Sequence, residues 1–327
     1  MTKALLLALL LLAGCTAPPM PRAVTAQGSR AYLPMALVHG YQYLPAIQVN
    51  QYHWPVAGFS VMGAAREKLP VFYADTSPPM WFSDWWLGCE LYRENGLPYG
   101  QARYRAAYVP MVYREWDDFL LRCNDGRPLL VGNEPELAGQ GNLTPVEMAD
   151  LLHAAVDSGW AGPIWCCGVM VQHVGYMRQV VAEYRRMFGE WPAGVGVHAH
   201  LYVTGPDGSP VIASVSDDDI DRAQVAFDGF MALLDDEGLL GRRVVVSECC
   251  VLSNTLGQNE VLRAAGRLVG HVVARQDVAT VAWFSVSSRG GGENEFAASD
   301  LVTGSQVNAL GRAWTDYAAS GRVLRGD

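Results

Sequence analysis

The sequence predicts a single α/β domain with the architecture of a (β/α)8 barrel, also called a TIM barrel. Strand-like and helix-like stretches alternate along most of the chain, as they do in parallel α/β folds. Eight strand-like stretches fall within about 270 residues, which matches the size of such a barrel. An open doubly wound sheet is the alternative, but the chain has neither a GxGxxG nor a GxxxxGKS phosphate loop to support it.

Composition limits the kind of protein and the kind of ligand. The chain has 327 residues, of which 50% are hydrophobic, so it can bury one large core. Its net charge is -9, and it contains no cluster of Lys and Arg, which argues against a nucleic-acid surface. An acidic chain rich in aromatic residues suits a neutral ligand better than a polyanion. We also expect the protein to be a monomer.

The first residues have the pattern of a bacterial lipoprotein signal. Lys3 is followed by an apolar stretch at 4–12 and then by Leu-Ala-Gly-Cys ending at Cys15. We therefore expect 1–15 to be a signal sequence, Cys15 to be lipidated, and the protein to be anchored to a bacterial membrane outside the cytoplasm. An ordinary secretory signal with a chance Cys is the alternative, and it would also export the protein. The apolar run is too short to span a bilayer unaided.

After this signal, the proline-rich stretch 16–51 suits an extended tether, and 52–327 is expected to form the catalytic barrel. Six cysteines remain after Cys15, and an oxidising compartment allows disulfides. Cys89 and Cys123 are the favoured pair. The adjacent pairs at 166–167 and 249–250 lie in strand-like runs, where neighbouring side chains point to opposite faces, so we expect buried free thiols there.

The predicted strands and helices follow in order. The strands are at 57–63, 70–74, 107–113, 128–132, 163–169, 194–202, 243–247 and 280–286. Thr144 and Pro145 begin a helix with a capping box, and its apolar face continues until Gly159. A second helix starts near Ser216 and stops at Gly238, and a third covers 261–273. Three aspartates at 217–219 suit the N-terminal end of the second helix.

Two of these strands end in glutamate. Glu134 follows the fourth predicted strand and Glu248 follows the seventh. In a (β/α) barrel the chemistry sits at the carboxyl ends of the strands, where loops bring side chains together. A retaining glycosidase needs one protonated and one ionised carboxyl group about 5 to 5.5 Å apart. Spacing alone does not say which glutamate has which role.

Six short motifs, in the order in which they occur along the chain, also resemble the motifs of a known family. They are Phe-Tyr-Ala-Asp-Thr-Ser-Pro at 72–78, Val-Pro-Met at 109–111, Asn-Glu-Pro-Glu at 133–136 with Gln-Gly-Asn-Leu-Thr-Pro at 140–145, His-Leu-Tyr at 200–202, Ser-Glu-Cys at 247–249 and Val-Ala-Trp-Phe at 281–284. Together they cover about 59–314 and resemble glycoside hydrolase family 128, whose catalytic domain is alkali-sensitive-linkage-protein-like and belongs to clan A.

The resemblance implies a metal-independent and cofactor-free hydrolase with a polysaccharide or oligosaccharide substrate, and the first choice is an endo-acting enzyme on β-1,3-glucan. It implies that Glu134 is the acid/base, that Glu248 is the nucleophile, and that Asn133 donates to the sugar 2-hydroxyl. The expected substrate-binding residues are Asn133, His200, Tyr202, Trp283, Tyr113 and Asp75.

The sequence also departs from the family pattern. Gly132 stands where the family has an aromatic residue, Thr76 stands in place of a Trp, Asp75 in place of an Asn, and Cys249 in place of a Phe. Aromatic rings stack on sugars, so the cleft is altered. Three tryptophans could supply replacement platforms or form a hydrophobic lid, and they are Trp81, Trp85 and Trp86.

Two other classes of function compete with this hypothesis. One is a glycan-binding lipoprotein whose altered cleft does not turn over its ligand. The other is a metal-dependent hydrolase that uses His198 and His200, which lie on one face of a strand. No further ligands could be placed at other strand ends, so no metal is expected. We expect one histidine to bond a sugar or a carboxylate and the other to pack.

Overall fold

The computed structural model describes residues 57–61, 68–75, 80–84, 107–287, 289–290, 293–294 and 296–320. Contacts within the chain divide it into Met1–Leu44 and Pro45–Asp327, and all described residues belong to the second unit. The predicted signal, the tether, Cys15, Cys89, Trp85 and Trp86 lie outside the described residues.

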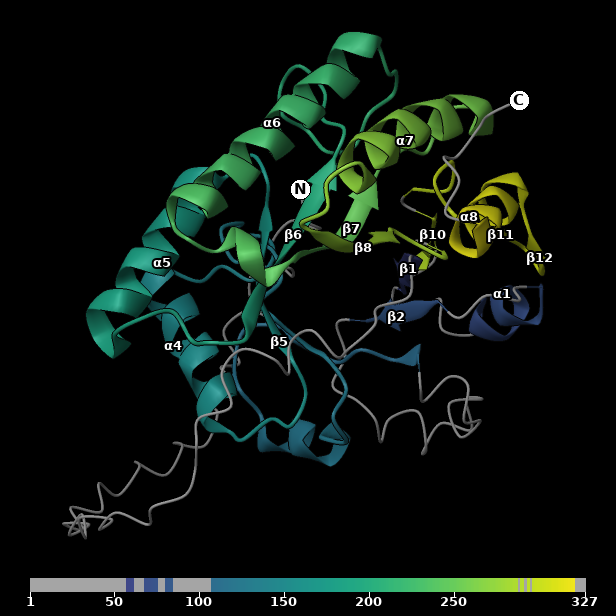
Figure 1. Cartoon of the computed structure of the whole chain (residues 1–327). Helices are drawn as coiled ribbons and strands as arrows, with labels where there is room; N and C mark the ends of the chain where they lie inside the picture. The colour runs from purple at the N-terminus through teal and green to yellow at the C-terminus, as the bar shows by residue number, and fades with distance from the viewer. Residues whose placement is uncertain are drawn as a thin grey trace, which may run out of the picture. The chain divides into compact units, whose positions relative to one another are not determined.

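Eight parallel strands form one sheet that closes into a (β/α)8 barrel, as predicted (Figure 1). They are β1 (Ala57–Ser60), β2 (Trp81–Ser83), β3 (Met111–Val112), β4 (Leu129–Val131), β5 (Ile164–Met170), β6 (Val195–Tyr202), β7 (Val244–Cys250) and β8 (Val278–Trp283). Neighbours in the sheet follow the chain, and β1 pairs with β8. A parallel bridge between Phe82 and Tyr108 joins β2 to the segment before β3 and completes the circle.

Helices cover the outside of this barrel. They are α1 (Leu69–Asp75), α4 (Pro145–Asp157), α5 (Val174–Phe188), α6 (Asp217–Asp236), α7 (Gln258–Val273) and α8 (Ala309–Ser320). The helices from α4 to α8 each pack against the next. Shorter elements are the 3-10 helices Asp118–Cys123 and Leu240–Arg242 and two hairpins, β9 (Arg289–Gly290) with β10 (Glu293–Asn294) and β11 (Val302–Thr303) with β12 (Gln306–Val307).

Two predicted helix starts are confirmed, whereas the third helix, α7, begins at Gln258 instead of at 261. Thr144 accepts a hydrogen bond from the Glu147 amide and Glu147 reaches back to the Thr144 amide, so the capping box fixes the start of α4. Ser216 and Asp219 do the same for α6, and Asp217 forms ion pairs with Arg263 of α7 and with Arg267. None of the helices in the described part of the chain combines the length and apolarity needed to cross a bilayer.

One predicted strand is wrong. Residues 70–74 lie in the helix α1, and the second strand is β2, which none of the predicted strands covers. The short apolar run at 70–74 fits either a helix turn or a strand, because five residues are too few to show a period. The number of strands is still eight, so Glu134 follows the fourth strand as predicted. Glu248, which was predicted to follow the seventh strand, lies within it, because β7 extends to Cys250.

Two tryptophans fill the interior of the barrel near the amino ends of its strands. Trp81 and Trp165 are buried, and they pack with apolar side chains that include Met111, Leu130 and Val245. A Cβ atom on Gly58 would lie 2.2 Å from the Trp81 ring, and one on Gly196 would lie 2.4 Å from the Trp165 ring. Glycine at these two positions therefore makes room for the rings. Trp81 is a core residue, which excludes it as a sugar platform.

The adjacent cysteines differ from the prediction. Cys166 and Cys167 form one disulfide and Cys249 and Cys250 form another, so these are not free thiols. The prediction assumed regular strands, but the pairing of both strands shifts register beside these residues. Cys123 is also disulfide-bonded, and Cys89, its expected partner, lies outside the described residues.

Candidate active site

The carboxyl ends of β4, β6 and β7 bring Glu134, His200 and Glu248 together. One polar atom from each of the three side chains lies within 4.8 Å of the others. The Nδ1 atom of His200 is 3.4 Å from Oε1 of Glu134 and 3.6 Å from Oε2 of Glu248. Glu134 is 9% exposed and Glu248 is 3% exposed. Two glutamates that are 114 residues apart in sequence (248 minus 134) thus share one centre.

The turn after β4 holds Glu134 in an unusual backbone conformation. Its φ of 41° is left-handed, which costs a residue other than glycine about 1 to 3 kcal/mol. The Glu134 amide donates to the Gly168 carbonyl at 2.8 Å, and the Glu134 carbonyl accepts from the Leu137 amide at 3.0 Å. These bonds fix the conformation and direct the carboxylate toward His200.

Gly132 stands where the family has an aromatic residue, and its backbone conformation and surroundings favour glycine. Its φ is +89°, and a Cβ atom there would lie 2.3 Å from the Cys167 carbonyl oxygen. An aromatic residue does not fit between β4 and β5 in this arrangement. The missing aromatic side chain is therefore linked to a close approach of the two strands directly below Glu134.

Tyr202 and His200 on β6 surround Glu248. The Tyr202 hydroxyl donates to Oε2 of Glu248. Burial, followed by the charges of Glu248 and Glu134, raises the pKa of Tyr202 well above its ordinary value, so the hydroxyl keeps its proton. Burial alone would lower the pKa of His200, but the charges of Glu248 and Glu134 outweigh it and the pKa is raised. His200, which lies near both carboxylates, therefore holds a proton more readily than a free histidine does.

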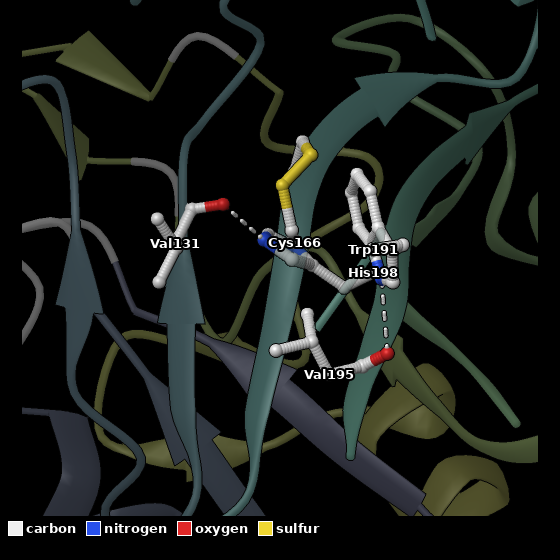
Figure 2. The surroundings of a disulfide bond; sticks show 6 residues. Val131, Cys166, Trp191, Val195 and His198 are labelled. Carbon is white, nitrogen blue, oxygen red and sulfur yellow. Dashed lines mark hydrogen bonds between the residues drawn. A yellow bond between two sulfur atoms is a disulfide. The ribbon is translucent and has the colours of Figure 1, made fainter. Parts of the chain in front are cut away.

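His198 precedes His200 by two residues on the same face of β6, and its pKa is shifted in the opposite direction. Burial and the charge of His200 lower the pKa of His198 to about 3, so the ring is neutral and has one N–H group. Its Nε2 lies 3.0 Å from the Val131 carbonyl, which can only accept, so Nε2 carries the proton (Figure 2). Nδ1 then accepts from the Ser247 hydroxyl at 2.8 Å.

The low pKa of His198 predicts a specific loss of stability in acid. An unfolded histidine takes up its proton near pH 6.5, whereas folded His198 does so only near pH 3. Protonation between these values favours the unfolded state, so stability is lost as the pH falls. The expected loss is about 2 kcal/mol between pH 6.5 and 4.5. His200 has a raised pKa, so its contribution is already complete below pH 6.5.

Denaturant unfolding at a series of pH values measures this effect in the wild type and in His198→Gln. The variant retains an amide that can donate to Val131 but has no group that titrates in this range. We expect its free energy of unfolding to change less between pH 6.5 and 4.5 than that of the wild type. Equal slopes in the two proteins would contradict the assignment of a neutral buried His198.

The other predicted site residues are placed as follows. Asn133 is buried beside Glu134. Tyr113 lies at the same end of the barrel, and its hydroxyl donates to Oε1 of Gln140 at 2.8 Å. Burial is the main cause of the raised pKa of Tyr113, and the charges of Glu134 and Glu248 add to it. Asp75 ends the helix α1 instead of a strand, and its side chain lies outside the described part of the structure.

The structure does not bring Trp283 to this group. Its ring is fully buried against Trp314 of α8 at a centroid distance of 5.3 Å, and its Nε1 donates to the Ser299 carbonyl. The next residue, Phe284, is the one whose ring meets Tyr202, edge to face at 6.3 Å. The sequence contained both aromatic residues, but no local signal showed which one faces the mouth of the barrel.

Glu136 and His173 form a polar pair that could not be predicted from the sequence. Oε1 of Glu136 accepts from the Met170 amide at 2.7 Å and lies 3.0 Å from Nδ1 of His173. The hydrogen bond to Glu136 is the main cause of the raised pKa of His173. This pair fixes the loop after β4 to the end of β5. The neighbouring Glu-Pro-Glu motif indicated Glu136, but nothing in the sequence indicated its partner.

The group formed by Glu134, His200 and Glu248 is the one place in the described structure where three such ligand atoms converge and could hold a metal ion. His198 does not join it, because both of its ring nitrogens are engaged with Val131 and Ser247. The metal site considered from the sequence, with His198 and His200 as joint ligands, therefore does not form.

Comparisons with known proteins agree on the fold. No protein-family model matches the sequence, and no curated protein matches it. A family 128 (subgroup I) endo-β-1,3-glucanase from Amycolatopsis mediterranei, in complex with laminaritriose, is a structural match with a TM-score of 0.57 and 20% identity over 80% of this chain and 99% of that one.

Two further matches come from other subgroups of the same family. A subgroup II endo-β-1,3-glucanase from Pseudomonas viridiflava has a TM-score of 0.54 and 20% identity over 80% of this chain and 97% of that one. A subgroup VI exo-β-1,3-glucanase from Aureobasidium namibiae has a TM-score of 0.54 and 14% identity over 80% of this chain and 96% of that one. The chain thus has the barrel fold of family 128 glycoside hydrolases.

Proposed function

We propose that the protein is a retaining glycoside hydrolase that cleaves a β-linked glucan by double displacement. The observation that carries this proposal is the pair of strand-end glutamates, whose nearest oxygens lie within 4.8 Å of each other at the mouth of the barrel. Carboxyl groups about 5 to 5.5 Å apart leave no room for the water that an inverting enzyme places between them.

The surroundings of the two carboxylates support different roles for them. Glu248 accepts a hydrogen bond from Tyr202 and is the more deeply buried, which suits an ionised nucleophile held in one orientation. Glu134 lies on the turn after β4 and is more exposed, which suits an acid/base that exchanges protons with the leaving group and with water. His200 lies 3.4 Å from Glu134 and 3.6 Å from Glu248, so it links the two carboxylates electrostatically.

The substrate class rests on the structural neighbours. Those from Amycolatopsis and Pseudomonas are described as endo-β-1,3-glucanases, and the one from Aureobasidium as an exo-β-1,3-glucanase. We therefore propose β-1,3-glucan as the substrate and endo cleavage as the mode. Phe296 is only partly buried and packs on the buried cluster that contains Tyr202 and Phe284, so its ring is the candidate aromatic face for a sugar.

The proposed enzyme works outside the cytoplasm. The lipoprotein pattern that ends at Cys15 supports export and a lipid anchor, with 16–51 as a tether between the membrane and the barrel. Labelling of the expressed protein with a fatty-acid probe tests this anchor, and a Cys15→Ala variant is the matched control.

A hydrolysis screen tests the proposed function. The purified protein is incubated with laminari-oligosaccharides and with β-1,4, mixed-linkage, mannan and xylan substrates, and the first product is followed by proton NMR. We expect cleavage of β-1,3-glucan, with the β-anomer of the new reducing end appearing first. An α-anomer appearing first would contradict the retaining mechanism, and binding without cleavage would favour a glycan-binding protein. Loss of activity in a chelator would favour a metal at the Glu134, His200 and Glu248 group.

A further inference from the structure

Two of the central strands each contain one residue more than their neighbours. On β5, Cys167 pairs with His198 and Val169 pairs with Ala199, so Gly168 has no partner on β6. On β7, Val246 pairs with Ala199 and Glu248 pairs with His200, so Ser247 is the extra residue. The pairing with β8 agrees, because Val246 to Cys249 on β7 spans only Val281 to Trp283. We call these the Gly168 bulge and the Ser247 bulge.

The Gly168 bulge orients Glu134. A residue left out of the ladder has a free carbonyl group, and the Gly168 carbonyl accepts the Glu134 amide at 2.8 Å. This bond holds the left-handed turn at Glu134. Gly168 itself has a φ of +69°, and a Cβ atom there would lie 2.6 Å from the Gly132 carbonyl oxygen, so only glycine fits.

The Ser247 bulge orients Glu248. In a regular strand, successive side chains point to opposite faces, so Ser247 and Glu248 could not both face the interior of the barrel. Here the Ser247 hydroxyl bonds His198 and the Glu248 carboxylate bonds Tyr202, and both partners lie on the inner face of β6. The Ser247 carbonyl also accepts from the Ser60 hydroxyl of β1 at 3.3 Å. The extra residue is what turns Glu248 toward the mouth.

His198 contacts both bulges from the strand between them. A Cβ atom on Gly168 would lie 2.9 Å from Cε1 of His198, so the ring packs directly on the Gly168 backbone. On its other side, Nδ1 accepts from Ser247, and Nε2 donates to Val131 at the end of β4. The ring is fully buried. One side chain therefore joins the three strands β4, β5 and β7.

We propose that His198 is a positioning residue for both carboxylates, because it locks the bulge that orients Glu134 and the bulge that orients Glu248. This inference rests on the proposed function of the two glutamates as acid/base and nucleophile. His198 does not reach the substrate. It acts by fixing the separation of the two carboxylates, on which double displacement depends.

Two variants that break the same hydrogen bond test this proposal. His198→Gln keeps a donor for Val131 but removes the acceptor for Ser247, and Ser247→Ala removes the donor. Each is expected to lower kcat about 10- to 100-fold with KM changed by no more than about threefold, since a displacement of about 1 Å can cost that much. The double variant should lose no more than the worse single variant, because both substitutions break the same bond between these two side chains.

Thr280→Val is the matched control. It removes another buried hydrogen bond of the barrel interior, from Trp81 Nε1 to Thr280 Oγ1 at 2.9 Å. We expect a lower melting temperature and a kcat within about twofold of the wild type. A kcat within about twofold of the wild type in His198→Gln and Ser247→Ala as well would overturn the proposal, as would effects that multiply in the double variant.

A spectroscopic measurement separates this proposal from the proposed function. In protein with 15N-labelled histidine rings, long-range correlation spectra should show His198 as the Nε2–H tautomer and neutral down to about pH 4. Ser247→Ala should shift its Nδ1 resonance. If His198 behaves in this way and the wild type cleaves no glycan, the proposed function fails while the bonding of His198 stands. An Nδ1–H tautomer, or titration near pH 6.5, overturns the role of His198 directly.

Discussion

Glu248→Ala is expected to lower kcat on a β-1,3-glucan by at least about 10³-fold, equivalent to about 4 kcal/mol of transition-state stabilisation. The variant has no group that can attack the anomeric carbon, and Tyr202 and His200 then face an empty position. Initial rates on laminari-oligosaccharides measure the loss. Circular dichroism and the melting temperature show whether the barrel remains folded.

Azide makes this experiment specific for the nucleophile. A small anion can enter the space left by the missing carboxylate and attack from the same side, so Glu248→Ala should recover activity and release an α-glycosyl azide. Glu183→Gln, which changes a partly exposed carboxylate on α5 that pairs with Arg186, should behave like the wild type. Full activity of Glu248→Ala without azide would exclude Glu248 as the nucleophile.

Glu134→Ala should cause a loss of similar size on natural glucans, because the leaving sugar then departs without protonation. With an aryl glycoside whose phenol leaves without help, formation of the glycosyl-enzyme should be nearly normal, and its hydrolysis becomes the slow step. A burst of phenol followed by a slow steady rate is the expected result in stopped-flow measurements.

The product formed with azide distinguishes the two glutamates. In Glu134→Ala, azide attacks the intermediate on Glu248 from the opposite side and should give a β-glycosyl azide, whereas Glu248→Ala gives the α-product. Swapped products would exchange the two assigned roles. If neither variant forms an azide adduct and the aryl glycoside shows no burst, the double-displacement mechanism is wrong.

The sequence predicted the barrel and brought the two glutamates to the same end of it. The prediction rested on local features of the sequence, which the fold retains. They are the strand and helix periods, the capping box at Thr144 and the glutamates after strand-like runs. The prediction failed where the signal was too short. The five residues at 70–74 form a helix, and β2, which contains only Trp81–Ser83, is too short to be predicted.

The orientation of side chains at the mouth of the barrel was not readable from the chain. Alternation along β8 does not tell whether Trp283 or Phe284 faces Tyr202, because the strand ends between them. Burial and the contact with Trp314 placed Trp283 in the core. The prediction of free thiols at the adjacent cysteines was wrong for a related reason. It assumed regular alternation of side chains at places where the strand register shifts.

The sequence by itself thus determined the class of fold and the two strand ends on which the proposed chemistry depends. Only the tertiary structure decided how those strand ends are oriented. The bulges at Gly168 and Ser247 exist only relative to the strands that pair with β5 and β7, and His198 has its role only because it lies between them. Register is a relation between segments far apart in the chain, so no local pattern encodes it.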